Sequence, residues 1–215
     1  MSEHDDVPWI SVPKGIQELR DWYDLRAKKY DVYLQEELGW QAPERTAEFF
    51  ARYVPKEARI LDAGAGTGLM GESLSKLGYD NLVAMDLSQG MLDEAKSKML
   101  YRELHQMVMG EPLDFATNSF DAVASVGVLT LGHAPASSLD ELLRITRLGG
   151  YIVFILRTDV YEDHGFKEKL AALEAEHRLK LIEVSEKFQA LPIGQPELWH
   201  QVWVFQVVSP KMDKQ

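Results

Sequence analysis

The chain has 215 residues, with 23 lysine and arginine residues against 34 aspartate and glutamate residues, so its formal net charge is −11, and it contains no cysteine. The length and the 46% of apolar residues predict one compact globular domain. The missing cysteines exclude disulfides, thiolate zinc sites and cysteine nucleophiles, and the acidic balance disfavours nucleic acid and anionic membranes as partners.

The first six residues are acidic and no apolar stretch follows them, so we expect no secretory signal peptide. The longest apolar runs, such as residues 151–156, are far shorter than the roughly 18 residues that a membrane-spanning helix needs. The sequence therefore predicts a soluble, cytoplasmic protein.

Two amphipathic helices are predicted before the first strand. Residues 14–30 carry an apolar stripe at helical spacing, made of Ile16, Leu19, Tyr23, Ala27 and Tyr30. A second helix is expected from Pro43, which suits a first helical turn, to Pro55, which ends it. We expect a helical cap in residues 1–55 and a core in residues 56–215, within one domain overall.

Strands and helices alternate from residue 59 onward. Residues 59–62 predict a strand, and residues 69–77 predict a helix that Gly78 closes. Residues 81–85 predict a second strand, Ser88 is a suitable N-cap for a helix reaching about residue 100, and residues 105–109 predict a short third strand.

The C-terminal half continues this alternation. Residues 120–126 predict a fourth strand, and Ser138 with Glu141 has the pattern of a capping box for a helix that ends at residues 149–150. Residues 151–157 predict a fifth strand, a helix follows around Phe166, Leu170 and Leu173, and strands are expected near residues 179–188 and 201–208. The pattern predicts an α/β fold with a parallel sheet buried on both faces.

A glycine-rich loop joins the first strand to its helix. Gly64, Gly66 and Gly68 allow positive φ angles and a close approach of the backbone to a ligand, although a tight turn without a ligand has the same composition. The dinucleotide fingerprint requires a third glycine where this chain has Leu69. Asp62, before the loop, would repel a pyrophosphate and attract an ammonium or sulfonium group, so we expect a cationic ligand.

Asp86 ends the second predicted strand. An acidic side chain at this place can accept hydrogen bonds from both hydroxyls of a ribose, which indicates a nucleoside. The alternative is that Asp86 caps the following helix.

Three segments resemble the class I S-adenosylmethionine-dependent methyltransferases: Leu61-Asp62-x-Gly64-x-Gly66-Thr67-Gly68, Met85-Asp86-Leu87-Ser88-x-x-Met91-Leu92 and Asn118-Ser119-Phe120-Asp121-x-Val123. The resemblance extends from about residue 23 to residue 205. More narrowly, the chain is similar to the methyltransferase-like proteins of the Williams–Beuren region and their microbial relatives, through segments such as Gly39-Trp40-x-Ala42-Pro43 and Glu141-Leu142-Leu143-Arg144.

This resemblance implies a three-layer, Rossmann-like sandwich with a seven-stranded, mostly parallel sheet, an antiparallel last strand, helices on both faces and an N-terminal helical cap. It implies S-adenosyl-L-methionine as cofactor and S-adenosyl-L-homocysteine as product, with no metal. The glycines would lie against the methionine and ribose parts of the cofactor. The cofactor-binding residues that it implies are Asp62, Gly64, Gly66, Thr67, Gly68, Asp86, Leu87, Met91, Glu111 and Tyr30.

Within this set, Asp62 would reach the amino-acid end of the cofactor, Asp86 the ribose, and Glu111 the adenine amino group, although residues 109–113 depart from the usual pattern. Leu87 and Met91 would wall the adenine or simply fill the core. Tyr30 would close over the cofactor, where a cation–π contact with the sulfonium is available, or it packs on the core as an ordinary helix residue.

Catalytic and substrate-side candidates come from the loops. His133 is the best candidate for a general base, because it follows the fourth strand, where the sheet opens to ligands, although a solvated loop histidine is the usual alternative. Arg157 would clamp an acidic substrate or form a surface salt bridge. Tyr33 and Trp40 would supply an apolar substrate wall or belong to the core.

A small molecule is the expected methyl acceptor. Residues 125–131 lack the Asn/Asp-Pro-Pro-Tyr/Phe run associated with methylation of adenine in nucleic acid, and methylation of cytosine C5 needs a cysteine. The alternative functions are a nicotinamide-dependent oxidoreductase and an interaction protein that binds the cofactor without transfer. We expect a monomer or a homodimer, for which Trp199 and Trp203 would either line the contact or cover the sheet.

Overall fold

The computed structural model describes residues 15–130 and 132–209. The predictions for residues 1–14 and for Leu131 lie outside the described residues. Within these two ranges, no helix combines the length and the apolar character that crossing a membrane requires.

A seven-stranded sheet forms the centre of the molecule, in the order β3-β2-β1-β4-β5-β7-β6. The five neighbouring strands from β3 to β5 pair in parallel, and β7 runs antiparallel to both of its neighbours, β5 and β6, so β6 has the same direction as the first five. The predicted seven-stranded, mostly parallel sheet with an antiparallel last strand is therefore confirmed. The strands are β1 (Ile60–Ala63), β2 (Leu82–Asp86), β3 (Tyr101–Gln106), β4 (Phe120–Ser125), β5 (Thr146–Arg157), β6 (Leu179–Val184) and β7 (His200–Val207).

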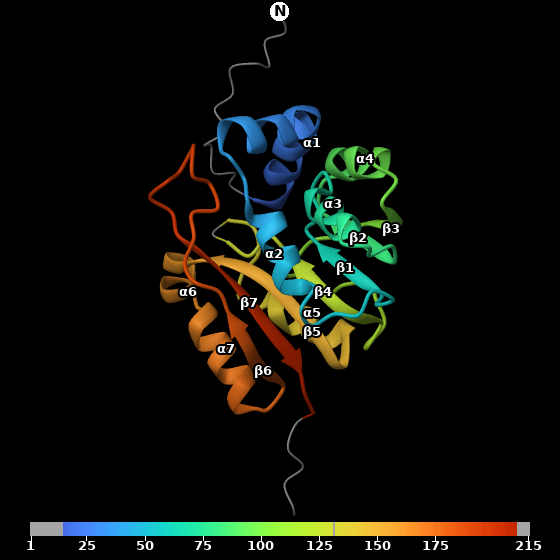
Figure 1. Ribbon diagram of the computed structural model, residues 1–215. Helices are drawn as coiled ribbons and strands as arrows, with labels where there is room; N and C mark the ends of the chain where they lie inside the picture. Colours follow the sequence, from blue (N-terminus) through green and yellow to red (C-terminus); the bar gives the residue numbers. More distant parts are fainter. Residues whose placement is uncertain (1–14, 131, 210–215) are drawn as a thin grey trace, which may run out of the picture.

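Helices cover both faces of the sheet, which gives three layers (Figure 1). Helices α2, α3 and α4 pack on one face, and α5, α6 and α7 pack on the other. Helix α1 packs against α4 and lies across the end of the sheet where the parallel strands finish (Figure 1). The helices are α1 (Ile16–Val32), followed by the π-helical turn η1 (Tyr33–Glu37), α2 (Ala42–Phe50), α3 (Leu69–Lys76), α4 (Gln89–Ser97), α5 (Ser138–Ile145), α6 (Thr158–Asp163) and α7 (Phe166–Ala175).

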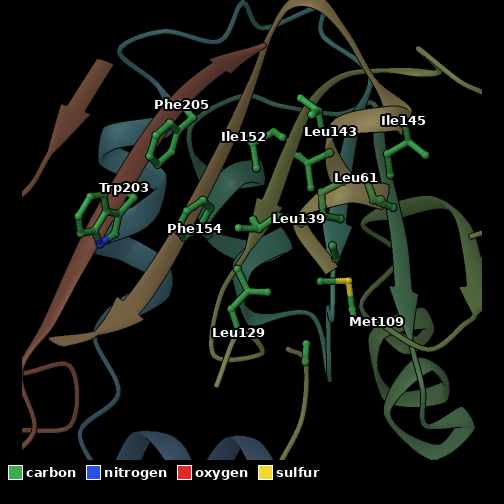
Figure 2. Packing of buried hydrophobic residues seen from close by; sticks show 14 of the residues in the cluster. Leu61, Met109, Leu129, Leu139, Leu143, Ile145, Ile152, Phe154, Trp203 and Phe205 are labelled. Atoms are coloured by element: carbon green, nitrogen blue, oxygen red, sulfur yellow. The ribbon is translucent and has the colours of Figure 1, made fainter. Parts of the chain in front are cut away.

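The alternation of side chains along β5 explains why both faces are apolar. Ile152 and Phe154 point to the layer of α5 and α7, whereas Val153 between them points to the layer of α2 and α3. On the first face, Phe154 stacks on Phe205 with ring centroids 5.8 Å apart, and Phe205 stacks on Trp203 (Figure 2). Trp203 therefore covers the sheet, while Trp199 precedes β7 and is 44% exposed.

The third strand was predicted too far along the chain. It covers Tyr101–Gln106 rather than residues 105–109, because α4 stops at Ser97 and Met99 turns the chain with a positive φ of 56°. Tyr101 then packs against α3, at Gly71, where an added Cβ would lie 2.2 Å from the tyrosine oxygen. Polar residues on the outer faces of this edge strand hide its strand periodicity.

Helix α5 also differs from its prediction. Glu141 does not complete a capping box: its carboxylate accepts a hydrogen bond from the backbone N–H of Leu113 and pairs with Arg144. The Oγ atom of Ser138 is buried and has no hydrogen-bond partner among the described residues. The helix ends at Ile145, and residues 146–150 open the 12-residue strand β5 instead of extending the helix.

Candidate active site

A cavity of about 330 Å³ lies between α1 and the ends of the parallel strands. The loop after β1, the end of β2, the segment after β3 and the loop after β4 line it from the sheet side. Residues of α1, of segment 33–43 and of segment 191–195 line it from the opposite side. Ligands of open α/β sheets bind at this end of the strands, so the cavity is the candidate site.

The glycines of the loop have different roles. Gly66 has a φ of +54° and faces open space, since a Cβ added there would meet no atom within 4 Å. Gly64 makes room for the loop after β4: its Cβ would lie 2.1 Å from Val128 Cγ2. The backbone N–H groups of Gly64 and Ala65 donate to the Met85 carbonyl and hold the loop against β2. Gly66 is therefore the position at which a ligand can approach the backbone.

Asp62 and Gly68 do not line the cavity. Gly68 begins α3 and leaves space for the ring of Tyr101, whose hydroxyl donates a 2.6 Å hydrogen bond to Asp62 Oδ2. Asp62 is only 1% exposed, and burial raises its pKa to about 7. The sequence predicts this carboxylate at the mouth of the loop, whereas in the structure it is buried and accepts its hydrogen bond from Tyr101.

Asp86 lines the cavity. Its two carboxylate oxygens accept hydrogen bonds from the backbone N–H groups of Gly66 (2.8 Å) and Ser88 (2.9 Å). Burial raises its pKa to about 6, although these backbone donors oppose the shift. Each oxygen keeps a second lone pair, so the carboxylate can also accept hydroxyl groups of a ligand.

Apolar side chains form the wall beside Asp86. Leu87 and Met91 line it, and Met107 and Val108 join them from the segment after β3. Glu111 is exposed and does not line the cavity. The reason is the earlier position of β3, which brings residues 107–109 to the place where the sequence pattern put Glu111.

Two acidic residues of α1 bind this helix to the glycine loop and to the start of α4. Asp24 Oδ1 accepts hydrogen bonds from Ser88 Oγ (2.5 Å) and from the backbone N–H of Gly90 (2.8 Å). Asp31 accepts a hydrogen bond from Thr67 Oγ1 and pairs with Lys98 Nζ at 2.7 Å. Thr67 lines the cavity, but its hydroxyl is engaged by α1. The heptad spacing of the two acids is the signal in the sequence that could have indicated this contact.

Tyr23 connects the helical cap to the loop after β4. Its hydroxyl lies 2.7 Å from His133 Nε2 and also makes a hydrogen bond with the hydroxyl of Tyr30. All three side chains line the cavity, and burial raises the pKa of both tyrosines. The structure thus brings together His133 and Tyr30, the predicted base and the predicted cover, through a residue that the sequence marked only as part of an apolar stripe.

On the substrate side, Tyr33 and Trp40 line the cavity, and Trp40 packs against Gly127, whose added Cβ would lie 3.3 Å from the indole. Arg157 does not line it. Its guanidinium pairs with Asp159, with Nε 3.0 Å from Oδ1, which is the surface salt bridge that the sequence left as the alternative. Three further residues line this side of the cavity: Leu38, Leu191 and Gln195. The sequence contains no motif that predicts their place in the site.

Comparisons with known proteins agree with this geometry. A family model described as a methyltransferase domain matches residues 61–154. The chain is 34% identical to Methyltransferase-like protein 27 of Homo sapiens over 165 residues, which are 75% of this chain and 66% of that protein. It is 35% identical to the demethylmenaquinone methyltransferase of Renibacterium salmoninarum over 150 residues, which are 66% of this chain and 60% of that protein. The chain therefore spans up to about two thirds of the length of these curated relatives.

A solved structure has the same fold. The TehB-like SAM-dependent methyltransferase from Corynebacterium glutamicum superposes with a TM-score of 0.62 and 24% identity, over 85% of this chain and 98% of that one. The carboxyl ends of the parallel strands thus carry the cavity in a fold that known proteins share.

Proposed function

We propose that this chain, a member of the class I S-adenosylmethionine-dependent methyltransferases, transfers a methyl group from this cofactor to a nitrogen, oxygen, sulfur or carbon atom of a small molecule. The observation that carries the proposal is the joint placement of Gly66 and Asp86 in the wall of one cavity. Gly66 offers open space beside the backbone, and the buried Asp86 carboxylate offers acceptors for hydroxyl groups.

The chemistry of the cavity residues supports this cofactor. Asp86 would hold the ribose hydroxyls, and Leu87, Met91 and Met107 would enclose the adenine. The methionine part would run past Gly64 and Gly66, beneath Tyr30, whose ring face can stabilise a positive charge. The acidic residue expected at the adenine amino group, Glu111, is not part of this fit.

When bound, the cofactor supplies an electrophilic methyl group: a lone pair of the acceptor forms the new bond to carbon, the bonding pair stays on sulfur, and the acceptor loses a proton where it has one. The chain aligns the two reactants under α1 and keeps water out, and such positioning contributes roughly 7–11 kcal/mol. His133 would receive a proton from the acceptor, with its ring oriented by Tyr23.

Two other functions remain as alternatives. A nicotinamide-dependent oxidoreductase is disfavoured by Leu69, which occupies the place of the third glycine in the dinucleotide fingerprint. An interaction protein that binds the cofactor without transfer would share every feature of the cofactor site. A cytoplasmic location, a monomeric or homodimeric state, a boundary at residue 55 and the narrower Williams–Beuren relationship stay predictions.

Calorimetric titration with S-adenosylhomocysteine and with NADH tests the cofactor assignment. We expect saturable binding of S-adenosylhomocysteine and no binding of NADH; the reverse result would establish the oxidoreductase. A screen of metabolite pools with radiolabelled S-adenosylmethionine then tests transfer. Incorporation of label into a small molecule is expected, whereas cofactor binding without any acceptor would favour the interaction protein.

A further inference from the structure

The cavity has a second, well-built wall away from Asp86, which we call the acceptor wall. It consists of Tyr33, Leu34, Leu38, Trp40, Leu191 and Gln195. Its two segments are joined by backbone hydrogen bonds from Gln41 to Ala190 (3.0 Å) and from Ile193 to Leu38 (3.2 Å). The main chain at Gly194 is pressed against Leu38, which lies 2.0 Å from where a Cβ would be. These contacts hold the wall in a fixed shape.

Positive charge is missing from the cavity. Among the residues that the structure describes, no lysine or arginine lines it, Asp86 is the one formally charged side chain in its wall, and His133 is the one other acid–base group besides the tyrosines. The arginines nearest in the sequence to the cavity residues act elsewhere: Arg26 lies over the Trp22 ring, 4.2 Å from its centroid, and Arg157 pairs with Asp159. No side chain of the cavity wall can therefore pair with a carboxylate or a phosphate of the acceptor.

Besides the Tyr33 hydroxyl and the Trp40 indole N–H, the acceptor wall carries the amide of Gln195. Gln195 is fixed in a turn, because its backbone N–H donates to the Leu191 carbonyl at 2.9 Å and its carbonyl accepts from Leu198 at 3.1 Å. Gln195 lines the cavity, and its side-chain amide carries both a donor and an acceptor. Such a group recognises a neutral hydroxyl, amine or carbonyl, whereas the aromatic rings of Tyr33 and Trp40 favour a flat apolar partner.

We propose, on the basis of the proposed function, that the methyl acceptor is an uncharged molecule with a flat apolar ring that carries a hydroxyl or amino group. Its ring packs against Trp40, and one of its polar groups makes a hydrogen bond with the Gln195 amide. Acceptors that carry a carboxylate or a phosphate bind more weakly, because no cationic side chain of the cavity wall pairs with them.

Four naphthalene compounds that share one ring system test the charge preference: naphthol, naphthylamine, naphthoate and naphthyl phosphate. Their binding is measured by calorimetry at neutral pH, with the protein saturated by S-adenosylhomocysteine. Naphthol and naphthylamine should bind at least roughly tenfold more tightly than the two anions, a difference of about 1.4 kcal/mol. If the neutral compounds bind no better than the anions, the inference is wrong.

The variant Gln195→Lys places a cation in the acceptor wall and should raise the affinity for naphthoate by roughly tenfold while it weakens naphthol binding. Gln35→Lys is the matched control, because it adds the same charge at an exposed position of η1 that does not line the cavity. Equal naphthoate binding by the two variants would contradict the assignment of Gln195.

Binding of S-adenosylhomocysteine is measured first on each variant and reports on folding. If the unmodified protein does not bind it, the proposed function fails. If it binds and naphthoate is preferred, the inference about the acceptor fails alone.

Discussion

At the scale of single residues, Asp86 has the most specific assignment. Replacing it by alanine should weaken binding of S-adenosylhomocysteine by about 1–3 kcal/mol, because the ribose hydroxyls lose a charged acceptor. Asp93→Ala is the control, since this acid lies on the exposed side of α4 and bonds to Gln89. Calorimetry measures the affinity of both variants for S-adenosylhomocysteine. An unchanged affinity in Asp86→Ala would show that this residue is not part of the cofactor site.

Gly66 can be tested against a glycine with the same backbone properties. Gly66 and Gly78 both have positive φ angles and open space where a side chain would begin, but Gly78 does not line the cavity. Gly66→Val and Gly78→Val should therefore lose similar stability, about 1–2 kcal/mol from backbone strain. Binding of S-adenosylhomocysteine should be abolished in the first variant and kept in the second. Retained affinity in Gly66→Val would contradict the role of the loop.

Asp62 makes stability depend on pH. Its pKa rises from 3.8 to about 7 in the fold, so the folded state holds this proton more tightly than the unfolded chain. The resulting stabilisation is complete below about pH 4 and is lost as the pH rises through 7. Asp62→Asn removes the ionisation, so its free energy of unfolding should fall less over this range in urea titrations, with the remaining decrease contributed by Asp86.

Asp80→Asn is the control for this measurement, since the Asp80 side chain is 85% exposed. It should follow the pH dependence of the unmodified protein. If the free energy of unfolding falls with pH equally steeply in Asp62→Asn and in Asp80→Asn, ionisation of the buried Asp62 does not cause the pH dependence of stability.

At the scale of elements, α1 lies over the cavity and lines one side of it. Asp24 and Asp31 connect it to the N-terminus of α4 and to the glycine loop, and Tyr23 connects it to the loop after β4. A bound cofactor would lie beneath this helix, so its exit requires these hydrogen bonds to break. The lifetime of the complex should therefore depend on them.

Asp31→Ala should increase the dissociation rate of S-adenosylhomocysteine by roughly three- to tenfold, which corresponds to the loss of about one hydrogen bond. Asp21→Ala removes the same charge from the same helix, at an exposed position where the acid bonds to Gln17. Stopped-flow displacement compares the two rates. Similar rates for both variants would show that the contacts of Asp31 with Thr67 and Lys98 do not hold α1 in place.

The order of elements was predictable because their signals are local. The run of apolar residues in β1, the glycines after it and the Ser88 cap, whose Oγ accepts a hydrogen bond from the Met91 N–H, each depend on a few neighbouring residues. The third strand was misplaced because it is an edge strand with polar outer faces. Helix α6 was missed because six residues carry too little periodicity.

At the scale of the whole molecule, the cavity depends on contacts between distant parts of the sequence. Asp86 was predictable, because its position at the end of a strand already determines where its carboxylate lies. The burial of Asp62 was not predictable, because its hydrogen-bond partner Tyr101 belongs to another strand. The space for the ring of Tyr101 is left by Gly68 and Gly71. The acceptor wall likewise combines segments about 150 residues apart, Leu38 with Ile193, and no local pattern predicts such a pair.

The central claim is that the loop after β1 and Asp86 hold S-adenosylmethionine in the cavity beneath α1. A crystal structure with S-adenosylhomocysteine bound tests it most directly. We predict that both ribose hydroxyls lie within hydrogen-bonding distance of the Asp86 carboxylate and that the homocysteine chain passes Gly64 and Gly66. A ligand bound outside this cavity, or ribose hydroxyls directed away from Asp86, would contradict the account.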